Sequence, residues 1–158
     1  MTTLTKEMLL ELGVTDVKED GTVFVRGIKK EPYPIIAKHN YGKDKTYLAI
    51  ALQDYSKKYV TTRKHKRKDG KVSTWKSWSY AVRTIPLARL MLAWFKGEVP
   101  GNMDADHIDG NPMNNNLDNL QMLSRQENLA KRNLSWSEIN HLYWEKKREL
   151  EKKNCKEE

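Results

Sequence analysis

The first half of the chain alternates short apolar runs with turn residues. Residues 5–12 have the apolar spacing of a short helix, which Gly13 is expected to end. Residues 14–26 place valines on both sides of Asp20-Gly21, a dipeptide that favours tight hairpin turns. Residues 46–52 read Thr-Tyr-Leu-Ala-Ile-Ala-Leu and predict a strand.

Two later segments have helical periodicity. Residues 86–96 open with Pro86, are followed by Gly97, and have the spacing of a buried stripe, formed by Leu87, Leu90, Met91, Trp94 and Phe95. Residues 135–153 open with Ser135 and Glu138 at capping-box spacing. Beyond Trp144 this second segment becomes rich in Lys and Glu, and we expect it to fray.

A second hairpin is predicted around Asp69-Gly70, because residues typical of strands flank this turn signal on both sides. Residues 57–76 around it hold nine Lys and Arg against one Asp, so they account for the whole formal charge of +8. Such a concentration of charge is typical of a phosphate-binding surface, although a solvated loop would look similar. A two-stranded ribbon fits the major groove of DNA, and we expect its aromatic residues to pack it onto the core.

Composition excludes several classes of protein. The 158 residues fit one domain with appendages, and five Trp and seven Tyr argue against disorder. No apolar run is long enough to span a membrane, and the N-terminus shows no secretory signal. Cys155 is the single cysteine, which excludes a disulfide framework and a cysteine-ligated zinc site and favours the cytoplasm.

Residues 103–133 carry the candidate chemistry. Asp109-Gly110-Asn111-Pro112 is a strong turn signal between predicted strands at 103–107 and 119–123. Ser124 and Glu127 then form a capping box that predicts a helix. The expected order is strand, Asn-rich loop, strand and helix.

The same segment brings together residues suited to phosphodiester hydrolysis. Asp106 and Asn128 offer the hard oxygen ligands that Mg²⁺ or Mn²⁺ prefers, and His107 is a candidate general base. Adjacent strand residues point to opposite faces, so Asp106 and His107 converge on one phosphate only if the strand ends or bends there. Taken singly, each of these residues could instead serve only as a turn, capping or strand-end residue.

The motif resembles the HNH endonuclease family, in particular the phage and homing-endonuclease branch whose third signature residue is Asn. The likeness covers roughly residues 80–133 and rests on Asp106-His107-Ile108-Asp109-Gly110-Asn111-Pro112, Asn114-Asn115, Asn119-Leu120 and Glu127-Asn128. It implies a ββα-metal fold with one divalent ion. The chain lacks the Cys pairs and the final His of other branches, which favours Mg²⁺ over zinc.

The resemblance also implies individual roles. His107 would be the general base, with Asp106 and Asn128 as metal ligands. Asn119 would hold the loop and orient His107. The loop itself would be braced by hydrogen bonds from Asp109, Asn111, Asn114 and Asn115.

We therefore expect an α+β protein in three parts: a β-rich DNA-binding part at 1–79, a ββα-metal nuclease core at 80–133, and a helix with a charged tail at 134–158. The expected activity is cleavage of double-stranded DNA to 5′-phosphate and 3′-hydroxyl ends, by a monomer that nicks or a homodimer that cuts both strands. Phage or mobile-element origin in a bacterial host would fit this resemblance. The residues expected to contact DNA are Lys64, Lys66, Arg67, Lys68, Lys71, Lys131 and Arg132.

Two alternatives remain open at this point. One is a non-catalytic DNA-binding protein on a nuclease scaffold. The other is an RNA-binding protein that uses Trp75 and Tyr80 of the basic hairpin as stacking platforms.

Overall fold

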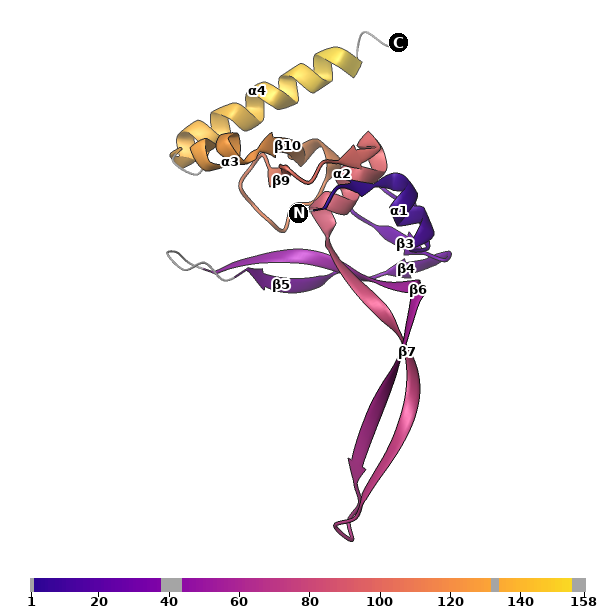
Figure 1. Ribbon diagram of the computed structural model, residues 1–158. Helices are drawn as coiled ribbons and strands as arrows, with labels where there is room; N and C mark the ends of the chain where they lie inside the picture. The colour runs from indigo at the N-terminus through magenta and orange to yellow at the C-terminus, as the bar shows by residue number, and fades with distance from the viewer. Residues whose placement is uncertain (1, 38–43, 132–133, 155–158) are drawn as a thin grey trace.

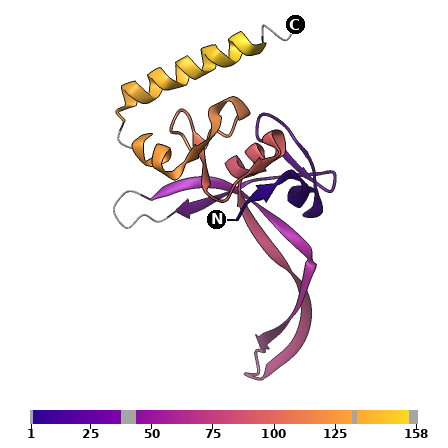
Figure 2. The same cartoon turned by 45° about the horizontal axis from the view of Figure 1, so that its top comes forward.

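The computed structural model describes residues 2–37, 44–131 and 134–154. The protein mixes helices and strands in an α+β arrangement (Figure 1). Helices α1 (Lys6–Glu11) and α2 (Leu87–Lys96) pack among short sheets (Figure 1). A long two-stranded arm formed by β6 (Lys45–Lys66) and β7 (Val72–Pro86) extends away from them. Helix α4 (Trp136–Asn154) lies on the opposite side of this body from the arm, as the second view also shows (Figure 2).

The N-terminal elements follow the predicted order. Helix α1 (Lys6–Glu11) is capped by Thr5, whose hydroxyl accepts a hydrogen bond from the backbone N–H of Met8 at 3.3 Å. Strands β2 (Val14–Val17) and β3 (Val23–Val25) form the expected antiparallel hairpin, which β4 (Ile28–Lys30) extends to three strands. The connection between β2 and β3 runs through residues 18–22, so it is longer than the tight two-residue turn that Asp20-Gly21 predicted.

Helix α2 (Leu87–Lys96) is the centre of the hydrophobic core, as its periodicity predicted. Leu90, Met91 and Leu92 are fully buried, and the N-terminal elements supply Leu9, Val14 and Val23 to the same cluster. The core thus draws on both sides of the expected boundary at 79–80, which strand β7 (Val72–Pro86) crosses without interruption. The prediction that Phe95 belongs to the buried stripe was wrong, because 38% of this residue is exposed.

Arg89 on α2 is a buried cation that ties three segments together. Its guanidinium donates hydrogen bonds to the carbonyls of Met103 at 2.8 Å, Val99 at 3.2 Å and Thr2 at 3.3 Å. Burial lowers the pKa of Arg89. These bonds fix α2 against β8 (Glu98–Val99) and against the start of β9 (Met103–His107).

A second three-stranded sheet contains β5 (Tyr33–Ala37), β6 (Lys45–Lys66) and β7, and it extends into the arm. The register of β6 and β7 shifts between Asp54 and Lys58 and then continues to the pair Lys66 and Val72. The predicted strand over 46–52 is therefore the start of a much longer one. The expectation that aromatic residues pack this ribbon onto the core was wrong, since Trp75 and Trp78 are 48% and 66% exposed.

The C-terminal half supplies the remaining elements. Strand β9 is followed by the 3-10 helix η1 (Leu117–Asn119), β10 (Leu120–Ser124), α3 (Arg125–Lys131) and α4 (Trp136–Asn154). Helix α4 begins at the predicted capping box, where Ser135 and Glu138 hydrogen bond to each other, and it continues through the Lys- and Glu-rich stretch that was expected to fray. Among the described residues, no helix is both long enough and apolar enough to cross a membrane. Cys155 lies outside these residues.

Candidate active site

The candidate site is built on a strand hairpin and the helix that follows it. Strands β9 and β10 pair antiparallel, with His107 opposite Leu120 and Asp106 opposite Gln121. Helix α3 then starts at the predicted capping box, because the backbone N–H of Ser124 donates to Glu127 at 2.7 Å and the N–H of Glu127 donates back to the Ser124 hydroxyl. The order of strand, loop, strand and helix is the one that the sequence predicted.

His107 is the last residue of β9 and is only 6% exposed. Its Nε2 lies 3.2 Å from Oδ1 of Asn115. The amide nitrogen of Asn115 donates to the carbonyls of Pro112 and Met113, both at 3.3 Å, which leaves the oxygen to face the ring. Because that oxygen can only accept, the proton of neutral His107 belongs on Nε2, and Nδ1 keeps a lone pair.

The surroundings of His107 favour the neutral form of its side chain. Burial lowers the pKa of His107, and this effect exceeds the opposite effects of Asn115, Asp106 and Asp109. Nearby Lys131 lowers the pKa further. A neutral imidazole with a defined tautomer is the form that can accept a proton.

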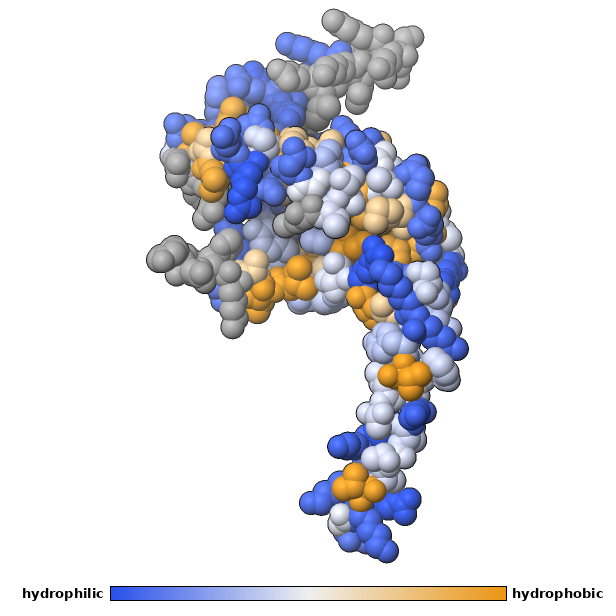
Figure 3. All heavy atoms as spheres, viewed as in Figure 1, coloured by the Kyte–Doolittle hydropathy of each residue, from blue (hydrophilic) through white to orange (hydrophobic). Residues whose placement is uncertain are grey.

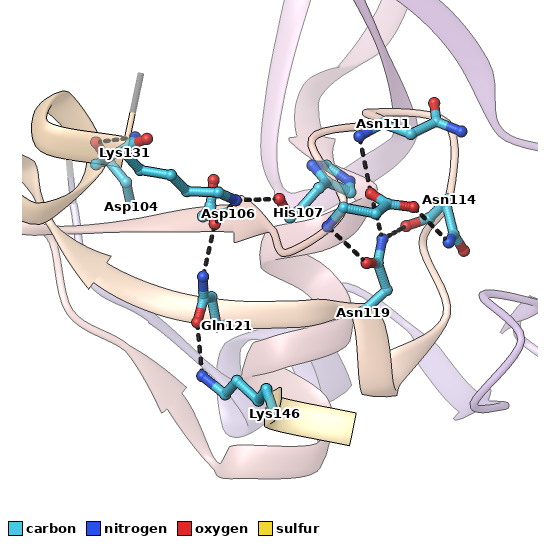
Figure 4. Close-up of polar contacts among 11 residues, drawn as sticks. Asp104, Asp106, His107, Asn111, Asn114, Asn119, Gln121, Lys131 and Lys146 are labelled. Atoms are coloured by element: carbon cyan, nitrogen blue, oxygen red, sulfur yellow. Dashed lines mark hydrogen bonds and ion pairs between the residues drawn. The ribbon is translucent and has the colours of Figure 1, made fainter. Parts of the chain in front are cut away.

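The Asn-rich loop between the strands is held by its own side chains, as Figure 4 shows. Asp109 accepts hydrogen bonds from the backbone N–H of Asn111 at 2.8 Å and from the side-chain amide of Asn114 at 2.8 Å. Asn119 is 2% exposed; its amide donates to Asp109 at 3.0 Å and to the carbonyl of Asn114 at 2.8 Å, and its oxygen accepts from the N–H of Asp109 at 3.1 Å. Asn119 thus binds the loop, whereas the residue that contacts the His107 ring is Asn115.

A polar cluster lies beside β9, where the strand faces α3. Asp104 and Asp106 are two residues apart on β9, so their side chains leave the same face of the strand. The amide of Asn128 on α3 donates to Asp104 at 3.0 Å, not to Asp106. Asp106 instead accepts from the Gln121 amide at 2.8 Å (Figure 4).

Lys131, at the end of α3, lies against this cluster. Its ammonium is 2.6 Å from Oδ2 of Asp106 and also donates to the backbone carbonyl of His107. The side chains of Lys131 and Asp106 are only 11% and 13% exposed. The sequence analysis named Lys131 as a DNA contact, and the structure places it on the proposed metal ligand; Arg132, named with it, lies outside the described residues.

The cluster contains oxygen donors of the kinds that bind hard divalent cations, while among the described residues no group of three or more His, Cys, Asp or Glu side chains is placed to hold a metal ion. Two carboxylates, Asp104 and Asp106, and the amide of Asn128 gather between β9 and α3, and oxygen donors of these types suit Mg²⁺ or Mn²⁺. Lys131 already sets a positive charge against one of these carboxylate oxygens.

A shallow pocket borders the cluster on the side of α4. It is lined by Ile108, Gln121, Lys131, Leu142, Glu145 and Lys146. The ammonium of Lys146 donates to Gln121 at 2.6 Å, so α4 is linked to Asp106 through one intervening side chain (Figure 4).

The site residues follow one another along the chain: Asp106 and His107 end β9, Asn119 ends η1, and Asn128 lies on α3. The comparisons with known proteins bear on this same segment. Residues 87–130 match the family model of HNH endonucleases. This HNH segment begins at α2 and contains β9, the Asn-rich loop, β10 and nearly all of α3. Neither the search of curated proteins nor the search of solved structures found a match.

Outside the HNH segment, the basic residues named from the sequence lie at the far end of the arm. Lys64 and Lys66 are among the last residues of strand β6, and Arg67, Lys68 and Lys71 are in the connection to β7. All five are exposed. The connection is closed by a hydrogen bond from the N–H of Arg67 to the carbonyl of Lys71 at 2.8 Å.

Two features of the HNH segment were missed from the sequence. Asp104 was not named, although its position two residues before Asp106 could have placed it on the same strand face. Asn115 was named only for bracing the loop, and no local pattern indicated that its amide would contact the His107 ring.

Proposed function

We propose that the chain is a metal-dependent endonuclease that hydrolyses phosphodiester bonds of double-stranded DNA, with His107 as the general base. The observation that carries this proposal is the buried His107, whose Nε2 faces the amide oxygen of Asn115 and whose strand also carries Asp104 and Asp106. The match of residues 87–130 to HNH endonucleases supports the same reaction class. Asn at position 128, where other branches have His, favours the phage and homing-endonuclease branch.

In this proposal Nδ1 of His107 accepts a proton from the attacking water. The oxygen of that water forms a bond to phosphorus, the bond from phosphorus to the 3′ oxygen breaks, and the 3′ oxygen takes up a proton from solvent. Asn115 is a positioning residue, since its oxygen holds the proton on Nε2 and thereby keeps Nδ1 basic. Asn119 acts one step further away by tying the loop that carries Asn115 to Asp109.

Asp104, Asp106 and Asn128 would hold one Mg²⁺ or Mn²⁺ ion. When bound, such an ion stabilises negative charge on the phosphate and on the leaving oxygen. For a cation to reach Oδ2 of Asp106, the ammonium of Lys131 has to leave it. Released from Asp106, Lys131 is close enough to the His107 carbonyl to remain at the site.

The composition and shape of the arm support a nucleic-acid substrate. Its concentrated positive charge favours a polyanion, and a two-stranded ribbon has the cross-section that the DNA major groove accepts. RNA binding is the second candidate, because Trp75 and Trp78 are exposed enough to stack on unpaired bases. Tyr80, named earlier for this role, instead packs against Tyr55, with ring centroids 4.6 Å apart and ring planes tilted by 42°.

Incubation with supercoiled plasmid tests the activity. We expect conversion to nicked or linear DNA in Mg²⁺ or Mn²⁺, and no conversion in EDTA. Single-stranded RNA added as competitor distinguishes the two substrates, because it should inhibit weakly if duplex DNA is preferred. Cleavage that persists in EDTA would contradict the metal dependence, and an uncut plasmid under every metal condition would contradict the nuclease function.

A further inference from the structure

The strand register places most of the basic residues in the paired part of the arm on one face. Directly paired residues of an antiparallel ribbon share a face, and successive residues alternate between faces. The pairs Lys58–Tyr80, Val60–Trp78, Thr62–Lys76, Lys64–Thr74 and Lys66–Val72 therefore form one face, which we call the lysine face. It carries four lysines and no acidic residue.

The other face has a different composition and a different use. It is formed by the pairs Tyr59–Ser79, Thr61–Ser77, Arg63–Trp75 and His65–Ser73, and we call it the hydroxyl face. Its hydroxyls hold the two strands together: Thr61 and Ser77 hydrogen bond at 3.1 Å, and Ser73 donates to the carbonyl of His65 at 3.4 Å. Arg63 is its one residue with a permanent positive charge.

The lysine face has the length and the presentation of a DNA-contacting surface. From Lys58 to Lys66 the strand advances about 27 Å at the usual rise of an antiparallel strand, which approaches one turn of duplex DNA. The ammonium of Lys58 lies 4.3 Å from the Trp78 ring centroid, so a cation–π contact with this exposed indole holds the lysine side chain along the ribbon. In Figure 3 the arm is a narrow and largely hydrophilic projection.

The base of the arm is anchored, so its direction is set by the body. Asp54 is 5% exposed and forms an ion pair with Arg83 at 3.1 Å across the two strands. The hydroxyl of Ser56 donates to the same carboxylate, and the hydrogen bond from Ser56 is the largest cause of the lowered pKa of Asp54. The guanidinium of Arg26, between β3 and β4, lies 3.7 Å from the Tyr55 ring centroid.

We propose that the arm binds duplex DNA through the lysine face, while the hydroxyl face is turned away from the DNA and maintains the ribbon. This inference rests on the proposed function and specifies how its substrate is held. Charge complementarity selects the occupant, because lysines spaced along one ribbon face meet the phosphates of a duplex lying along it.

Two adjacent residues provide a matched test. Lys64→Gln and Arg63→Gln each remove one positive charge from the same strand, but from opposite faces. Binding to a 30-base-pair duplex is measured by fluorescence anisotropy across a salt series, in EDTA so that the DNA is not cut. We expect Lys64→Gln to flatten the slope of log affinity against log salt by about 0.9, and Arg63→Gln to leave it unchanged. Thr74→Lys, directly opposite Lys64, should steepen the slope by about the same amount.

The outcomes separate this inference from the proposed function. Equal flattening by Lys64→Gln and Arg63→Gln, or no effect of Lys64→Gln, would overturn the assignment of the lysine face while leaving DNA binding in place. Absence of salt-dependent duplex binding by the unmodified protein would overturn the proposed substrate itself. Displacement of the duplex by equimolar single-stranded RNA would assign the arm to RNA. Circular dichroism of each variant checks that the ribbon is still folded.

Discussion

Replacing Lys131 with Met is expected to tighten the binding of a divalent cation. In the structure the ammonium of Lys131 is 2.6 Å from Oδ2 of Asp106, and both side chains are nearly buried. A cation that binds Asp106 has to break this contact, so the lysine competes with it. Methionine keeps much of the side-chain volume and removes the competing charge.

The size of the effect follows from the contact that is lost. A hydrogen bond between charged groups contributes about 1.5–3 kcal/mol, and each 1.4 kcal/mol corresponds to about a tenfold change in affinity. The displaced lysine regains hydration, so the lower end of this range applies. We therefore expect Lys131→Met to bind Mn²⁺ about tenfold more tightly than the unmodified protein. Without metal, the variant should melt at a lower temperature, because Asp106 loses its ion pair with Lys131.

Isothermal titration with Mn²⁺ at neutral pH measures the affinity directly. Lys152→Met is the matched control, since Lys152 is exposed on α4 and its replacement removes one charge without touching the cluster. Unchanged or weaker Mn²⁺ binding by Lys131→Met, relative to this control, would refute the competition. It would also remove the argument that Asp106 faces the cation site.

Three further predictions concern the base and the core. Asn115→Asp places a carboxylate at the His107 ring and should raise its pKa, so the acid limb of kcat/KM moves to higher pH; Asn116→Asp, at an exposed neighbouring position, should not move it. Burial lowers the pKa of His107 below its usual value of about 6.5, so the unfolded chain takes up a proton at higher pH than the folded protein does. The free energy of unfolding should therefore be largest above about pH 6.5 and should decline as the pH falls below it. Urea titrations of His107→Gln across this range should show a weaker pH dependence. Arg89→Met leaves three carbonyls without their donor and should cost about 3 kcal/mol, which lowers Tm by roughly 6–12 °C in a thermal melt, whereas replacing an exposed α2 residue (Lys96→Met) should change Tm little.

Local signals were sufficient to predict much of this fold. Helix α2, the turn at Asp69-Gly70 and both capping boxes depend on residues that are close in sequence, and all are present in the structure. The order of β9, the Asn-rich loop, β10 and α3 was predicted for the same reason. A strand over 46–52 and a hairpin around Asp69-Gly70 were also predicted, but not that both belong to one continuous ribbon.

What escaped prediction depends on which segments meet in three dimensions. Alternation places Trp75 and Trp78 on opposite faces of a strand, yet only the fold decides whether another layer covers either face, and in the arm neither is covered. Asn128 hydrogen bonds to Asp104, and Lys131 to Asp106, only because α3 packs beside β9 in the folded chain. Asp106 and His107 point to opposite sides of β9, as strand alternation predicted. Asp106 contacts Gln121 and Lys131, whereas His107 contacts Asn115 of the loop.

Comparison of His107→Ala with the unmodified protein tests the central claim most directly. Cleavage and binding are measured on the same labelled duplex, with Mg²⁺ for cleavage and EDTA for binding. The account predicts that the variant cleaves about 10²–10⁴-fold more slowly, while its affinity for the duplex stays within about twofold, because His107 acts as a base and is buried away from the arm. Cleavage at the unmodified rate by a folded variant would contradict the assignment of His107 as the general base.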